Sequence, residues 1–160
     1  MICRLKLISF ILFCLVSPLT LEEKVTVVTW EMAQELNYET GEMPDNLKHL
    51  NNQTVEVSGF IVPLQLGGYL DMIKEFVLVP NPLACIHVPP PPPNQMIYVT
   101  MNKEIPLDMD YRGVSIKGTL KFSKPTEMYN FYGMTLDGVS AKEANIEYED
   151  PFLDLIDNLP

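Results

Sequence analysis

The chain has 160 residues, the length of one ordinary domain. Its formal net charge at pH 7 is -10, and Arg4 and Lys6 are the only charged residues among residues 1–20, so the remainder carries -12. A surface this acidic repels phosphate backbones and anionic lipid headgroups. We therefore expect no nucleic-acid binding, and contact with a membrane only through an N-terminal anchor.

The first 20 residues are typical of a secretory signal peptide. A short cationic start is followed by the apolar stretch Leu7 to Val16 and by a polar exit at Ser17 to Thr20. The apolar stretch is shorter than the roughly 20 residues of a transmembrane helix. Because no small-x-small cleavage site follows, residues 1–20 are predicted to be either a signal peptide or an uncleaved N-terminal anchor. The predicted location is the periplasm, free or anchored to the inner membrane.

Two short helical segments are predicted next. Thr29 is a suitable N-cap for a helix that runs to Leu36, with acidic Glu31 in the first turn. A further helical turn is expected from Pro44 to Leu50, followed by a turn at Asn51 and Asn52.

From residue 53 onward the apolar residues recur with period two, which predicts β-strands. Gly59 is expected to mark a bulge or a close approach of two backbones. The fold class is therefore predicted to be mainly β: a small five-stranded OB-like Greek-key barrel with a short N-terminal helix, or alternatively a small β-sandwich. This single β domain is expected over residues 25–147, followed by an acidic C-terminal tail at 148–160. The five predicted strands cover residues 53–66, 75–79, 96–101, 114–122 and 132–139, the last continuing toward 144.

The chemistry of the domain is predicted to centre on Cys85 and His87. Cys3 and Cys14 lie in the first 20 residues, so Cys85 is the sole thiol after them, and no internal disulfide framework is possible. A lone thiol in an oxidising compartment must be buried, bound to metal or used in chemistry. In an extended segment Cys85 and His87 share one face, whereas Ile86 and Val88 share the other.

A thiolate and an imidazole at this spacing are two ligands for a transition metal. Zinc is favoured over copper(I), for which Met96, Met101 and Met134 are further possible donors. The five prolines that follow form a stiff polyproline II segment that offers no backbone donors to a sheet. We expect this rigid edge to be a binding segment; its residues are Pro89, Pro90, Pro91, Pro92, Pro93, Asn94 and Gln95.

Three explanations of the Cys85–His87 pair stay open at the level of sequence. The first is a partial metal site, which lacks its remaining ligands; the only other histidine is His49. The second is a structural role within a protein-interaction module. The third is an activated thiol, although no third member of a catalytic group is recognisable, so an enzyme is the less favoured class.

Several segments resemble the bacterial family called domain of unknown function 3299. They include Ala84-Cys85-Ile86-His87-Val88 with the prolines and Asn94-Gln95, and the stretches 57–64, 75–80, 114–120 and 132–134. The resemblance covers roughly Val27 to Ala144. It implies a small exported or lipid-anchored protein of Gram-negative bacteria, and it brings no enzymatic activity. Some members are encoded beside transport components and periplasmic zinc-handling proteins, which implies metal handling.

The function predicted from the sequence is that of a periplasmic accessory protein. It is expected to bind a transition metal, or to present one to an envelope transporter or to a periplasmic metal-binding protein, through Cys85 and His87. A non-enzymatic interaction module of an envelope transport complex is the alternative, and a thiol enzyme comes third.

Overall fold

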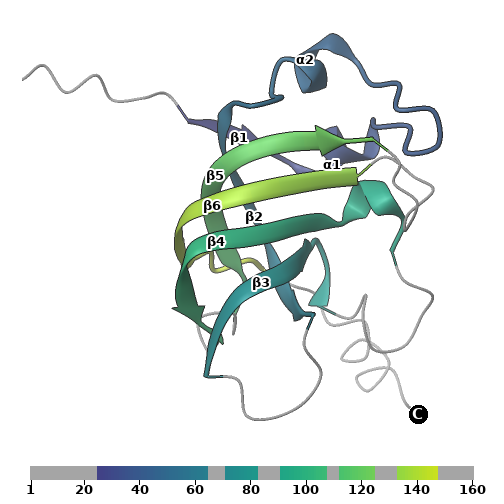
Figure 1. Cartoon of the computed structure of the whole chain (residues 1–160). Coiled ribbons are helices and arrows are strands. Elements are labelled where there is room, and N and C mark those ends of the chain that lie inside the picture. Colours follow the sequence, from purple (N-terminus) through teal and green to yellow (C-terminus); the bar gives the residue numbers. More distant parts are fainter. Residues whose placement is uncertain (1–24, 65–70, 83–90, 108–111, 125–132, 148–160) are drawn as a thin grey trace, which may run out of the picture.

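The computed structural model describes residues 25–64, 71–82, 91–107, 112–124 and 133–147. These ranges contain six strands and three short helical elements (Figure 1). In chain order they are β1 (Thr26–Val28), α1 (Trp30–Gln34), α2 (Asp45–Lys48), β2 (Thr54–Pro63), β3 (Met72–Val79), the 3-10 helix η2 (Pro93–Gln95), β4 (Ile97–Pro106), β5 (Val114–Ser123) and β6 (Gly133–Glu143).

Five of the strands close into a barrel in the order β2-β3-β4-β6-β5 and back to β2. Closure depends on β2, which pairs with β5 through residues 54–59 and with β3 through residues 60–63. All pairs in the barrel are antiparallel except β4–β6, which is parallel. The predicted OB-like barrel is confirmed. The sandwich alternative is wrong, because β2 joins the two ends of one sheet and leaves no second layer.

The sixth strand, β1, was not among the predicted strands, since three residues are too few to show a period. It pairs in parallel with β2, Thr26 opposite Val55 and Val28 opposite Val57. The same part of β2 pairs with β5, so β1 lies along the opposite edge of β2. Because α1 begins two residues after Val28, and Val28 lies opposite Val57, the start of α1 lies beside the middle of β2.

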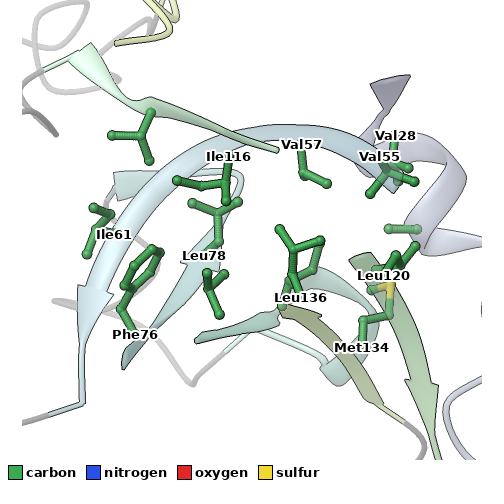
Figure 2. Packing of buried hydrophobic residues seen from close by; sticks show 14 of the residues in the cluster. Val28, Val55, Val57, Ile61, Phe76, Leu78, Ile116, Leu120, Met134 and Leu136 are labelled. Atoms are coloured by element: carbon green, nitrogen blue, oxygen red, sulfur yellow. The ribbon is translucent and has the colours of Figure 1, made fainter. Parts of the chain in front are cut away.

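The barrel is filled by the inward side chains of all five strands. Val55 and Val57 of β2, Phe76 of β3 and Leu136 of β6 are buried and point toward one another (Figure 2). At about 25 cal/mol per Å² of apolar surface removed from water, this shared interior is the main stabilising term.

The two α-helices pack on the same core. Thr29 caps α1 as predicted, its Oγ1 accepting a hydrogen bond from the backbone N–H of Met32. Leu36 and Leu47 are buried in the core cluster. The turn after α2 is joined to β5, because the Asn52 N–H donates to the Leu120 carbonyl over 2.7 Å. Among the described residues, no helix is long and apolar enough to cross a membrane.

Candidate functional site

The predicted metal ligands, Cys85 and His87, lie outside the described residues, as do Pro89 and Pro90. The structure does describe both flanks of their segment. One flank is the end of β3 with residues 80–82, and the other is the stretch from Pro91 to β4. The candidate site is therefore built from these two flanks and from the groups that hold them.

The first flank is held by close packing of β3 on β2. Val79, the last residue of β3, pairs with Phe60 and is 1% exposed. Beside it, a side chain on Gly59 would meet the Val79 carbonyl oxygen at 2.6 Å. The close approach predicted at Gly59 is thus confirmed, and residues 80–82 begin from a fixed point of the barrel.

The second flank is held by side-chain hydrogen bonds to α1. Pro92 has φ -62 and ψ 155, the polyproline II conformation expected of this run. The Asn94 Nδ2 donates to the carbonyl oxygens of Gln34 (3.1 Å) and Leu36 (3.0 Å). These carbonyls belong to the last turn of α1 and the residues just after it, where backbone acceptors lack intrahelical partners. The buried Gln95 Nε2 donates to the Trp30 carbonyl over 3.3 Å.

Trp30 connects this flank to β2. Its indole Nε1 donates to the Ser58 carbonyl over 2.7 Å, and its ring lies 3.1 Å from where a Gly59 side chain would begin. We call Trp30, Ser58, Gly59, Asn94 and Gln95 the Trp30 junction. No motif or spacing in the sequence singles out Trp30, although it is the only tryptophan of the chain. The junction fixes both flanks of the Cys85–His87 segment to one place on the barrel.

The structure also places several of the other possible metal ligands. Met101 and Met134, considered for copper(I), are buried in the barrel interior. His49 caps the C-terminal end of α2, and its Nδ1 contacts the Asp45 carbonyl. Within the described ranges, no group of three or more His, Cys, Asp or Glu side chains comes together.

A small polar concavity of about 140 Å³ lies elsewhere, on the outer face of β2, β5 and β6. Its central group is Glu56, whose Oε1 accepts hydrogen bonds from the Lys142 Nζ at 2.7 Å and from the buried Ser115 Oγ at 2.6 Å. These two donors, with desolvation opposing them, lower the pKa of Glu56 below its ordinary value of 4.5. The carboxylate therefore joins three neighbouring strands and has a structural role.

This network predicts a pH dependence of stability. Because the pKa of Glu56 is lower in the folded than in the unfolded chain, its contribution is present above the unfolded value of 4.5. The contribution disappears as the pH falls through the lower folded value. We expect the midpoint of urea unfolding to fall more for the parent than for Glu56→Gln between pH 7 and about pH 3. Parallel pH profiles of the two proteins would contradict this assignment.

The comparisons with known proteins agree with the fold and the motif. The pattern of the family described as "Protein of unknown function (DUF3299)" matches residues 20–143. The crystal structure of a DUF3299 family protein from Pseudomonas aeruginosa is similar, with a TM-score of 0.57 and 24% identity, covering 79% of this chain and 99% of that chain. None of the curated proteins matches this chain significantly. The chain belongs to the DUF3299 family, whose pattern spans its barrel and its Cys-Ile-His-Val segment.

Proposed function

We propose that the protein is a periplasmic accessory protein that binds a transition metal, zinc in preference to copper(I), through Cys85 and His87. In this proposal it presents the metal to an envelope transporter or to a periplasmic metal-binding protein. One observation carries the proposal: both flanks of the Cys85–His87 segment are held on the barrel by the Trp30 junction.

The fixed flanks matter because they reduce the conformational freedom that a metal site has to lose on binding. Val79 and Asn94 are held by the neighbouring strand and by α1, respectively. The ends of the segment also lie on adjacent strands, since Leu78 pairs with Ile97. Holding a segment by both ends lowers the entropic cost of bringing two ligands together on one ion.

The number of ligands favours transfer of the metal over permanent storage. A closed structural zinc site takes four protein ligands, whereas Cys85 and His87 provide two. The remaining positions would be filled by water or by donors from a partner, which leaves the ion open to exchange. The formal charge of -10 also attracts cations to the protein surface.

Zinc titration of the purified chain tests the proposal. We expect one zinc ion per chain, with the affinity at least tenfold weaker in Cys85→Ser and in His87→Ala, because each change removes one of two protein ligands. His49→Ala is the matched control, since it removes the only other histidine and should leave the affinity unchanged. Isothermal titration against a competing chelator gives the affinities.

Two results would contradict the proposal. One is a chain whose melting temperature does not change when zinc is added in excess. The other is equal loss of affinity in His87→Ala and His49→Ala, which would place the zinc on surface groups in general. Copper(I) titration of the same variants under reducing conditions decides between the two metals.

The conformation of Pro92 favours a second candidate, an interaction module. Pro92 is exposed and in the polyproline II conformation, the form in which proline-rich segments bind aromatic grooves. In this alternative the prolines contact a transport component and the Cys85–His87 pair is structural. Alanine at Pro91 and Pro92 should then abolish co-purification of that component, whereas Cys85→Ser should retain it. The opposite pattern would exclude the alternative.

A further inference from the structure

The barrel carries apolar side chains on its outer face as well as inside. Side chains from β2, from β3 and from the end of η2 with the start of β4 form a separate cluster around Phe60, Val77 and Val79. Pairing places them side by side, with Phe60 opposite Val79 and Val77 opposite both Val62 and Tyr98. We call Phe60, Val62, Val77, Val79, Met96 and Tyr98 the outer apolar patch. Figure 1 shows β3, which carries its centre, between β2 and β4.

The central members of the patch are covered although they point away from the barrel interior. Phe60, Val77 and Val79 are 6%, 7% and 1% exposed. A valine on the free face of a sheet would keep much of its surface in water, so these values indicate a covered face. Among the described residues that pack on the cluster, Ile146 is the one that comes from beyond β6.

Ile146 shows where the chain runs after the last strand. The Ala144 N–H donates to the Gly113 carbonyl over 3.0 Å, and the Ile146 N–H donates to the Arg112 carbonyl over 2.8 Å. These bonds hold the chain that follows β6 beside Arg112 and Gly113. There the Ile146 side chain packs against the outer apolar patch. The described part ends one residue later, at Glu147, so residues 148–160 start at the edge of the patch.

The sequence of residues 148–160, the C-terminal tail, contains enough apolar residues to cover the outer apolar patch. Its residues Phe152, Leu155, Ile156 and Leu159 recur at the spacing of one side of an α-helix. Asp150 and Pro151 are suitable for the cap and the first position of such a helix. From Ile146 to Phe152 an extended chain spans up to about 20 Å, and three neighbouring strands are about 10 Å wide. The tail is therefore long enough to cross the patch.

We propose that residues 148–160 dock on the outer apolar patch through Phe152, Leu155, Ile156 and Leu159. The occupant is then part of the same chain, delivered to the patch by Ile146. The consequence concerns ligand binding, because barrels of this topology use the corresponding strands, here β3 and β4, to hold ligands. In this protein the chain's own C-terminal tail covers that face, independently of any metal at Cys85 and His87.

The first test changes the tail in the full chain. We expect Phe152→Ser, Leu155→Ser and Ile156→Ser together to raise the fluorescence of an apolar-surface dye at least threefold and to lower the melting temperature. The matched control is Asp154→Ser, Asp157→Ser and Asn158→Ser, which changes the opposite side of the same predicted helix and should alter neither value. Equal dye binding in the two variants would overturn the proposal. A parent dimer that the apolar substitutions convert to monomer would also overturn it, because the tail would then bind a second copy.

The second test changes the patch. Val62 and Tyr98 are half-buried at its rim, so Val62→Ser with Tyr98→Ser should weaken docking while the barrel remains folded, as checked by circular dichroism. Chymotrypsin should then cleave the tail at Phe152 at least fivefold faster than in Val27→Ser, a control at a β1 residue that is 60% exposed. Equal cleavage rates would overturn the proposal. If the rim variant does not fold, the tail substitutions decide alone.

Discussion

Replacing Gly59 by alanine is expected to lower the free energy of unfolding by about 3 kcal/mol, the upper part of the range for overpacking a well-packed site. The new Cβ would lie 2.6 Å from the Val79 carbonyl oxygen and 2.9 Å from the Leu78 side chain. The carbonyl belongs to the backbone of a paired strand, so it cannot move without breaking the β2–β3 ladder. Urea unfolding followed by circular dichroism measures the loss.

The matched control for Gly59 is Gly133→Ala at the start of β6. There the nearest atom to a new Cβ is the Ser123 Oγ at 3.3 Å, a side-chain atom that has to shift by only a few tenths of an ångström. We expect a change within about 0.5 kcal/mol, as for most substitutions that remove no contact. An equal loss of unfolding free energy at Gly59 and at Gly133 would contradict this prediction. It would mean that the loss comes from replacing a glycine in general, and not from the close approach of Gly59 to Val79.

Replacing Trp30 by alanine is expected to cost about 3 kcal/mol, near the lower end for an aromatic residue because the side chain is half-buried. Two effects add: the ring leaves its contact with the core, and the Ser58 carbonyl loses its 2.7 Å donor. Trp30→Phe separates them, since it retains an aromatic ring but has no N–H. We expect Trp30→Phe to lower the free energy of unfolding by about 1 kcal/mol, the usual net contribution of one hydrogen bond.

The variants of Trp30 need a control on the same part of the chain. Val27→Ala in β1 changes a side chain that is 60% exposed and should be neutral within about 0.5 kcal/mol. Circular dichroism is the suitable probe, because Trp30 is the only tryptophan and its fluorescence is lost in both variants. A Trp30→Phe protein as stable as the parent would show that the hydrogen bond to Ser58 contributes nothing.

Much of the barrel could be predicted because alternation is a local property. Residues 114–122 were predicted as a strand, and β5 spans Val114–Ser123; the strand predicted from residue 53 corresponds to β2. The prediction was less complete for β3, which begins at Met72 and not at residue 75. A register shift between Ile73 and Glu75 interrupts the period there, so the pattern of apolar residues changes face within the strand.

The candidate site was less predictable than the strands. The sequence singled out residues 85–95 as a binding segment but gave no sign of what holds Asn94 and Gln95 in place. The structure shows both side chains donating to backbone carbonyls of residues 30–36, which lie 58 to 65 positions earlier in the chain. A hydrogen bond between residues so far apart leaves no periodic signal, so it could not have been found by following the pattern along the chain.

The sequence by itself determined the class of the fold, the approximate positions of five of the six strands among the described residues, and the membership of a family. Each of these depends on residue types and on their spacing along a few neighbouring positions. The tertiary structure alone decided that β2 closes the barrel between β3 and β5, and that Trp30 joins β2 to η2. It also decided that Val77 and Val79 are buried although they lie on the outer face of the sheet. These features arise from pairing between distant residues, which is fixed by the packing of the whole chain.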